Sequence, residues 1–269
     1  MNNKIEKACR ALKLIFKRPY LLNLVLESED VYKQKVSENY GLEDGLPLLH
    51  LETLFPGFQE TVSPYAYLSG ATMPIDIALL KSLARRQNAR SYFEIGTWRG
   101  ESVANVAAVV PDCVTLNLSR EEIVALTGDE TYADAHARFS KSLHNVTHLQ
   151  GNSQTFDFTP HLRRYDMVFI DGDHHSEAVK KDTQTAFRLL RDEKSVIVWH
   201  DYGYDPETIR WSVLNAIWEG TPGAKRQYLY QVANTMCAVY IPESFQTGKL
   251  TPHATPKHYY EVSLRSVDL

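Results

Sequence analysis

From residue 91 onward, short apolar segments alternate with helical ones, and this alternation constrains the fold more than any other feature of the chain. Seven segments have the composition of strands, namely residues 91–95, 113–118, 146–149, 165–170, 195–199, 227–232 and 236–241. Apolar residues at helical spacing lie between them, most clearly over 101–110, 176–190 and 206–219. Strands that alternate with helices predict a parallel sheet covered by helices on both faces. We therefore expect an α/β fold with a doubly wound, mainly parallel, seven-stranded sheet whose last two strands form an antiparallel pair.

The part of the chain before this alternation has a different character. Apolar residues at helical spacing predict a helix over residues 1–35, interrupted at Pro19. Glycine and proline recur between residues 40 and 72, which predicts loops, and residues 74–86 return to helix. These changes divide the chain into an N-terminal helical and loop extension (1–74), a main domain (75–242) and a C-terminal tail (243–269).

Composition and charge exclude several classes of protein. Hydrophobic residues make up 43% of the 269 residues and charged residues 23%, which is typical of a globular protein and not of a disordered chain. The formal charge of −4 argues against a nucleic-acid partner. No segment approaches the roughly 18 apolar residues of a transmembrane helix. Three scattered cysteines favour a reducing compartment, so a cytoplasmic protein is expected.

Residues 1–26 carry six basic residues against one acidic residue before Leu26, and apolar residues recur at helical spacing among them. One interpretation is weak peripheral contact with an anionic membrane. The simpler interpretation is a helix that docks on its own domain or on a second subunit, since a surface helix needs only this pattern. We expect a homo-oligomer and no transmembrane segment.

Polar residues follow the ends of the predicted strands, and these positions carry the candidate chemistry. In an open α/β sheet, ligands bind outside the carboxyl ends of the strands. The polar groups at those ends are residues 94–100, Asn117, Asn152 with Ser153, residues 171–175, and His200 with Asp201. We therefore expect all of them at one edge of the sheet.

The first of these segments is Glu94-Ile95-Gly96-Thr97-Trp98-Arg99-Gly100. Its glycines permit a tight turn and a close approach of the backbone to a ligand, and the following helix offers free N–H groups. An acidic residue so near the turn would repel a pyrophosphate but attract an ammonium group, which favours a ligand carrying an amino acid over a dinucleotide. A plain strand–helix turn is the alternative. Asn117 lies 21 positions after Gly96, where a side chain can hydrogen-bond ribose hydroxyls.

Two further segments combine carboxylates with imidazoles directly after buried strands: Asp171-Gly172-Asp173-His174-His175 and His200-Asp201. Such groups are costly to bury unpaired, so a function is favoured over simple capping of the next helix. If their strands are neighbours, Asp171 and Asp201 could share a divalent cation. Alternatively, Asp201 orients His200 or His174 as a base. The sequence leaves this choice open.

Taken in order, residues 94–102, 171–175 and 199–202 resemble the class I S-adenosylmethionine (SAM)-dependent methyltransferases, and more narrowly the macrocin O-methyltransferase-like branch. The resemblance covers residues 75–241 and implies a Rossmann-like methyltransferase fold. By resemblance, the cofactor would be bound by Glu94, Gly96, Thr97, Trp98, Gly100, Ser102, Asn117, Asn152, Ser153 and Asp171. Trp98 stands where the broader class has a glycine, and Asn117 replaces its usual acidic residue.

The resemblance also implies chemistry: O-methylation of a small hydroxylated molecule such as a sugar or natural product, with His174, His200 and Asp201 as catalytic residues. Metal-dependent relatives hold magnesium at positions like Asp171 and Asp201, although His200 departs from their pattern. The motif of amino-directed nucleic-acid methyltransferases is missing. Two alternatives stand beside this hypothesis. One is a metal-dependent hydrolase or hydroxylase-type enzyme built on Asp171, Asp173, His174 and His200, and the other is a non-catalytic binding module that acts through residues 1–70.

Overall fold

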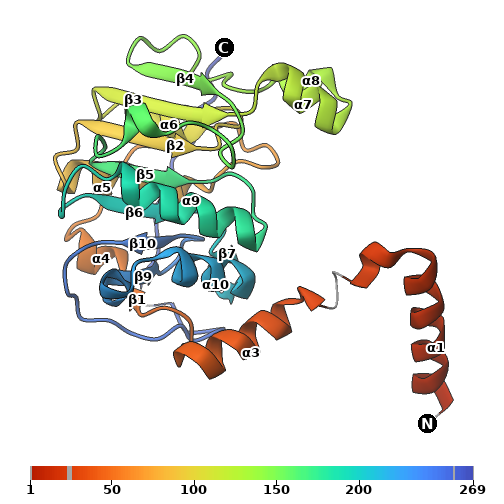
Figure 1. The fold of residues 1–269 in the computed structure, drawn as a ribbon. Coiled ribbons are helices and arrows are strands. Elements are labelled where there is room, and N and C mark those ends of the chain that lie inside the picture. Colours follow the sequence, from red (N-terminus) through yellow and green to blue (C-terminus); the bar gives the residue numbers. More distant parts are fainter. Residues whose placement is uncertain (1, 23–25, 257, 269) are drawn as a thin grey trace.

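The computed structural model describes residues 2–22, 26–256 and 258–268. Its centre is an eight-stranded sheet in the order β1-β9-β10-β6-β5-β2-β3-β4, with helices on both faces (Figure 1). The strands are β1 (Leu48–Leu49), β2 (Ser91–Ile95), β3 (Asp112–Asn117), β4 (Val146–Gln150), β5 (Met167–Ile170), β6 (Val196–Trp199), β9 (Leu229–Val232) and β10 (Ala238–Tyr240). Only β10 runs antiparallel to its neighbours in this sheet. The predicted α/β class and the mainly parallel sheet are confirmed.

All seven predicted strands are present, and the eighth is β1. It lies in the segment predicted as loop and pairs parallel with β9 through Leu48 and Leu49. Two residues are too few to show a period of two in the sequence. The pairing is decided by the exposed edge of β9, which a short buried apolar segment covers.

The helices are α1 (Asn2–Lys17), α3 (Glu29–Tyr40), α4 (Leu51–Leu54), α5 (Pro74–Arg86), α6 (Glu101–Ala107), α7 (Arg120–Thr127), α8 (Glu130–Asp134), α9 (Ser176–Leu189) and α10 (Trp211–Gly220). The 3₁₀ helices are η1 (Pro19–Leu22), η2 (Thr159–His161) and η3 (Gly223–Tyr228).

Two helix predictions were wrong in their extent. The described part of the predicted helix over 1–35 is divided into α1, η1 and α3, because Pro19 lacks the N–H that would continue the first helix. Residues 1 and 23–25 of that prediction lie outside the described residues. The helix predicted over 206–219 begins only at Trp211, because β7 (Gly203–Asp205) and β8 (Thr208–Ile209) form a small hairpin before it.

The hydrophobic core lies in two layers, one on each face of the sheet. One layer holds Phe93 and Ile95 of β2 with residues of α3, α9 and α10, and the other holds Tyr92 with residues of α4, α5 and α6. The alternation along β2 follows from the period of two in a strand. Glu94 has the same parity as Tyr92, so the fold buries this carboxyl group in the second layer.

Helix α3 is joined to the body of the protein. Its Val36 is fully buried in the first core layer, and its Lys35 pairs with Glu219 of α10 at 2.7 Å. Lys180 of α9 pairs with the same carboxylate at 2.8 Å, so one acidic residue links three helices. The proposed division of the chain at residue 74 remains a prediction. Among the described residues, no helix is long and apolar enough to cross a membrane.

Candidate functional site

The ends of three neighbouring parallel strands form the site. Strand β2 lies between β3 and β5, and β5 lies between β2 and β6. Ile95 pairs with Ile170, and Ile170 pairs with Trp199, so the residues that follow these three positions lie side by side. The backbone N–H of Asp171 donates to the Ile95 carbonyl at 2.8 Å, which extends the pairing past the end of β5. The expectation that β5 and β6 are neighbours is therefore confirmed.

The turn after β2 needs both of its glycines for packing. Gly96 has a φ of +94°, and a Cβ there would lie 1.9 Å from the carbonyl oxygen of Asp171. Gly100 has a φ of +80°, and a Cβ there would lie 2.2 Å from Oγ of Ser140. At Gly96 the turn thus approaches the end of β5 more closely than a residue with a side chain could. Helix α6 begins five residues after Gly96, at Glu101.

Glu94 is fully buried, and both of its carboxyl oxygens have partners. The Ser102 hydroxyl donates to Oε1 at 2.9 Å, and the Tyr92 hydroxyl donates to Oε2. Burial raises the pKa of Glu94 to about 8, with a smaller contribution from the charge of Asp171. These contacts bind α6 to β2. Direct contact of Glu94 with a cofactor remains a prediction.

The remaining groups of the turn lie next to β3. The Asn117 side-chain oxygen is 3.5 Å from the backbone nitrogen of Thr97. The Trp98 backbone has a φ of +42°, and its indole ring packs against Tyr132 with ring centroids 4.5 Å apart. Its Nε1 is buried without a hydrogen-bond partner among the described residues. Thr97, Trp98 and Asn117 are therefore together at the predicted edge.

Asn152 and Ser153 follow β4 and lie differently. Asn152 is exposed, and its side-chain oxygen accepts a hydrogen bond from the backbone of Gln154. The Ser153 hydroxyl donates to Asp182 of α9 at 3.2 Å. Burial raises the pKa of Asp182 to about 6, although its bonds to Ser153 and Gln154 oppose this. In this structure the Ser153 hydroxyl is hydrogen-bonded to the buried carboxyl group of Asp182. Contact of Ser153 with a cofactor remains a prediction.

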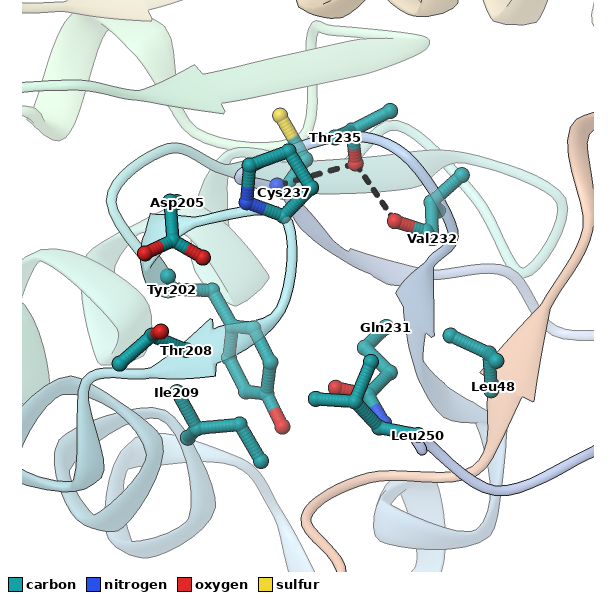
Figure 2. A pocket seen from close by; sticks show the side chains of 12 residues that line it. Leu48, Tyr202, Asp205, Thr208, Ile209, Gln231, Val232, Thr235, Cys237 and Leu250 are labelled. Carbon is teal, nitrogen blue, oxygen red and sulfur yellow. Dashed lines mark hydrogen bonds between the residues drawn. The ribbon is translucent and has the colours of Figure 1, made fainter. Parts of the chain in front are cut away.

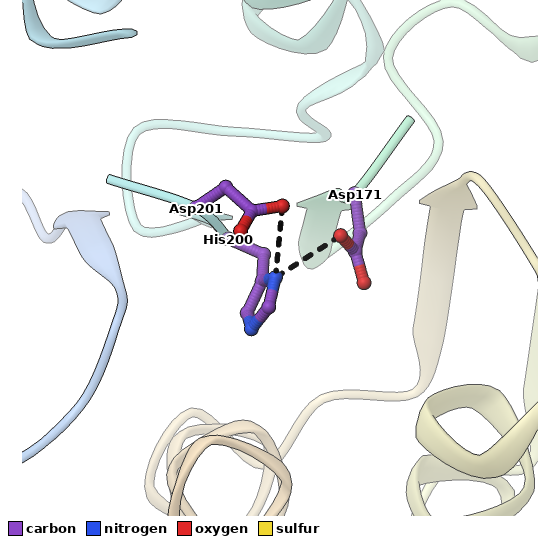
Figure 3. Close-up of side chains that lie close together, drawn as sticks. All are labelled: Asp171, His200 and Asp201. Atoms are coloured by element: carbon purple, nitrogen blue, oxygen red, sulfur yellow. Dashed lines mark ion pairs between the residues drawn. The ribbon is translucent and has the colours of Figure 1, made fainter. Parts of the chain in front are cut away.

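The centre of the site is the imidazole of His200, which faces three carboxylates. Its Nδ1 lies 3.1 Å from Oδ1 of Asp171 and 3.3 Å from Oδ2 of Asp201 (Figure 3). Its Nε2 lies 3.1 Å from Oδ2 of Asp76, which is fully buried in the first turn of α5. The Nδ1 contacts are ion pairs without the alignment of hydrogen bonds. The structure thus brings together Asp171, His200 and Asp201, as expected.

Asp76 was missed by the sequence analysis. The signal was present, because Asp76 is an acidic residue among the apolar residues of a helix that the sequence predicted. Its other oxygen accepts a hydrogen bond from the backbone of Met236 at 3.1 Å. A buried carboxylate in such a position needs a partner, and His200 supplies it. Thr72 was missed too, and its hydroxyl donates to Asp171 at 3.1 Å.

Electrostatics couple these groups. Burial lowers the pKa of His200, but the neighbouring carboxylates of Asp171, Asp201 and Asp76 hold it well above its usual value. Burial raises the pKa of Asp201, and the neighbouring His200 and His174 more than offset this, so its pKa lies below the usual range. Asp201 is consequently ionised at neutral pH.

His174 connects this centre to an open cleft. Its Nδ1 lies 3.2 Å from Oδ2 of Asp201, and about half of its side chain is exposed. The cleft has a volume of about 380 Å³ and is lined by Glu27, Glu29, Tyr32, Asp173, His174, His175, Ser176, Tyr204, Arg210 and Ser212. The first three of these come from the N-terminal extension. His174 is the one residue of the predicted catalytic set that lines the cleft.

The N-terminal wall of the cleft is anchored by Glu29. Its carboxylate accepts hydrogen bonds from the backbone of Trp211 and from the Ser212 hydroxyl, the latter at 2.6 Å. These groups belong to the first turn of α10, where a carboxylate satisfies free N–H groups and the helix dipole. The sequence did not predict this contact, because it joins residues 182 positions apart.

A second cavity lies away from these groups, beneath Tyr202 (Figure 2). It has a volume of about 10 Å³, which is close to that of one water molecule. Leu48, Ile209 and Leu250 line it, and the Thr235 hydroxyl bridges the backbones of Val232 and Cys237 at its rim. It is too small for a cofactor.

Residues 93–202 match the model of a family described as a methyltransferase domain. This match confirms the resemblance to methyltransferases over the segment that holds Glu94, Asp171 and His200. No curated protein matches the chain. Many solved structures are similar to this chain, and three of them are described in the next paragraph.

The O-methyltransferase from Bacillus cereus in complex with S-adenosylhomocysteine (SAH) is 18% identical, with a TM-score of 0.44 over 65% of this chain and 84% of that one. The O-methyltransferase TomG from Streptomyces achromogenes in complex with SAM is 22% identical, with a TM-score of 0.43 over 64% and 82%. The SAH-bound methyltransferase PaMTH1 from Podospora anserina is 15% identical, with a TM-score of 0.46 over 81% and 96%.

Proposed function

Because residues 93–202 form a methyltransferase domain, we propose that this chain transfers the methyl group of SAM to a hydroxyl group of a small molecule bound in the 380 Å³ cleft. The observation that carries this proposal is the position of His174. It contacts the partly buried carboxylate of Asp201 on one side and lines the cleft on the other. A hydroxyl nucleophile bound in the cleft needs a base at the cleft wall to accept its proton.

His174 is the proposed general base, and Asp201 is the group that orients it. Nδ1 of His174 faces the Asp201 carboxylate at 3.2 Å, which leaves Nε2 free to accept the proton of the hydroxyl group. The hydroxyl oxygen then forms a bond to the methyl carbon as the bond between that carbon and sulfur breaks, and SAH is the leaving group. His200 is buried, so it positions Asp201 and does not meet the acceptor.

The methionine and ribose ends of SAM are assigned to the turn from Glu94 to Ser102 and to Asn117. Gly96 contacts the backbone of Asp171, the hydroxyl group of Ser102 in the first turn of α6 donates to Glu94 of β2, and the free N–H groups of that turn suit the polar part of the cofactor. Asn152, Ser153 and Asp171 complete the proposed cofactor set.

The fold family also implies a divalent cation, and the donor set fits one. One donor atom from each of Asp171, His200 and Asp201 lies within 4.8 Å of the others. Asp76 accepts the Nε2 proton of His200, and this outer contact leaves Nδ1 directed at the two carboxylates as a ligand. Carboxylate oxygens suit magnesium or manganese, and the imidazole suits the softer transition metals. When bound, such an ion would stabilise negative charge on the acceptor oxygen.

The cleft indicates the kind of acceptor. Glu27, Glu29 and Asp173 contribute carboxylates, whereas the guanidinium of Arg210 lies over the ring of Tyr204 and 3.9 Å from Asp201. Negative charge therefore exceeds positive charge, which disfavours phosphorylated or other anionic acceptors. Carboxylates and tyrosine side chains suit a neutral molecule with several hydroxyl groups, such as a sugar.

Two neighbouring histidines provide the test. Calorimetric titration of the whole protein with SAH, with and without magnesium or manganese, first measures cofactor affinity. Turnover is then measured with radiolabelled SAM against sugars, polyols and phenols. His174→Ala should lower kcat by about 10²–10⁴-fold and leave the Kd for SAH unchanged.

His175→Ala is the matched control. His175 pairs with Asp173 at 2.5 Å and is 86% exposed, so its replacement should change KM and leave kcat within a factor of about two. Equal effects of the two substitutions on kcat would refute the assignment of the base. SAH binding without methylation of any acceptor would favour the non-catalytic binding module.

The hydrolase or hydroxylase-type alternative finds only part of its ligand set in the geometry, namely Asp171 and His200. It requires Asp173 to join the centre with Asp171 and His200. The Asp173 carboxylate instead accepts from the backbone and ring of His175, in the loop before α9. Tight metal binding without any affinity for SAH would be the result that restores it.

A further inference from the structure

Helix α1 stands apart from the rest of the protein. It extends from the N-terminal arm and does not cover the sheet (Figure 1). Among the described elements, α1 packs closely only against η1. Its described side chains are exposed except for that of Ile15, which is half-buried. Phe16 is 84% exposed and Ile5 is 63% exposed. Apart from η1, the part of the chain that the structure describes therefore buries almost none of the apolar surface of this helix.

The side chains of α1 are segregated into two faces. At 3.6 residues per turn, Ile5, Cys9, Leu12 and Phe16 fall on one face. Lys13 and Lys17 flank this face on one side and Lys4 on the other, whereas Arg10, Lys7 and Leu14 fall on the opposite side. The apolar face is thus bordered by basic residues over four turns. This is the arrangement of helices that lie in a membrane interface.

Charge is distributed just as unequally along the chain. The formal charge of −4 divides into +5 for residues 1–18 and −9 for residues 19–269. An anionic surface would attract α1 and repel the rest of the protein. Only α1 and the adjoining η1, which carries the exposed Tyr20 and Leu22, would then approach that surface.

Helix stability also requires a partner. Isolated helices shorter than about 12–15 residues are marginal in water, and most of the stability of helices in proteins comes from the packing of an amphipathic face. Helix α1 has 16 residues and gains no buried side chain from the body of the protein. The partner that it meets must supply that stabilisation.

A second copy of this chain fits these observations less well than a membrane. A standard protein interface uses about 20–30 residues from each side. The apolar face of α1 offers four side chains, those of Ile5, Cys9, Leu12 and Phe16. An interfacial helix needs no shape-complementary partner, because lipid chains adapt to the side chains that enter them.

We propose that α1 binds anionic lipid surfaces, with Ile5, Leu12 and Phe16 inserted at the boundary between headgroups and acyl chains. Lys4, Lys13 and Lys17, which flank the apolar face, contact the anionic headgroups. The catalytic cleft is then held near the membrane through α3, whose Glu29 forms one wall of that cleft. The inference does not depend on the proposed reaction.

The test is sedimentation of the full chain with lipid vesicles. Vesicles of phosphatidylcholine with 30% phosphatidylglycerol are compared with vesicles of phosphatidylcholine alone. Binding should occur to the anionic vesicles and fall at high salt. Lys13→Gln with Lys17→Gln should weaken it by roughly fivefold per charge, since each basic residue near the surface contributes about this factor.

Leu12→Ser and Leu14→Ser form a matched pair, because the same change is made two positions apart on opposite faces. Leu12→Ser should weaken vesicle binding at least about tenfold, and Leu14→Ser should change it less than twofold. Neither side chain packs against the body, so both variants should keep the thermal midpoint of the parent protein.

Three results would overturn the proposal. They are the absence of vesicle binding, equal binding to neutral and anionic vesicles, and equal losses for the two leucine variants. Light scattering on the same samples provides a further check. Self-association that Leu12→Ser abolishes, without vesicle binding by the parent protein, would identify a second copy as the partner of α1 instead.

Discussion

Replacement of Gly96 by Ala tests how the turn after β2 is joined to the site. The added Cβ would lie 1.9 Å from the carbonyl oxygen and 2.5 Å from the carbonyl carbon of Asp171. Both are backbone atoms, so no rotamer change can relieve the contact. A left-handed φ costs a residue with a Cβ about 1–2 kcal/mol, and overpacking costs about 1–3 kcal/mol more. The free energy of unfolding should fall by about 3 kcal/mol.

Gly128→Ala is the matched control. Gly128 ends α7 with a φ of +71°, but a Cβ there would meet no atom within 4 Å. Only the backbone cost applies, so the loss should be about 1 kcal/mol. The difference between the two variants therefore isolates the contact with Asp171.

Urea unfolding followed by circular dichroism measures both losses, and titration with SAH measures cofactor binding. Gly96→Ala should weaken SAH binding, because relief of the contact must displace Asp171 or the start of α6. Gly128→Ala should leave it unchanged. If the two variants lost equal stability, or if Gly96→Ala bound SAH normally, the argument from the close approach would be wrong.

Three further predictions concern stability. Asp182 binds its proton more tightly in the folded state, where its pKa is about 6. The free energy of unfolding should therefore fall by about 2 kcal/mol from pH 4 to pH 7, relative to the change in the Asp182→Asn variant. Urea titrations of both proteins at the two pH values measure this difference. Glu29→Ala removes the carboxylate that caps α10 and should cost about 1 kcal/mol in the same assay, and an unchanged midpoint would contradict the capping role. Thr183→Val leaves the buried indole N–H of Trp199 unpaired, so we expect a loss of about 1–3 kcal/mol, checked against the smaller effect of Thr185→Val.

The sequence by itself determined the class of fold and the edge of the sheet that carries the chemistry. Alternating strands and helices leave few topologies, and parallel strands place their carboxyl ends together. Asp171 and His200 could therefore be assigned to one place before any coordinates were known. The strand segments were also found, because runs such as 195–199 are apolar throughout and end at polar residues.

Tertiary structure alone decided how the groups at that edge are paired. The contact of His200 with Asp76 joins residues 124 positions apart, and the capping of α10 by Glu29 joins residues still farther apart. Local patterns carry no information about such contacts, because they depend on how helices pack on the sheet. The edge strand β1 and the cleft beside His174 could not be predicted for the same reason, because distant segments of the chain form them. Residue types thus set which chemistry is present, whereas the packing of distant segments set which groups meet.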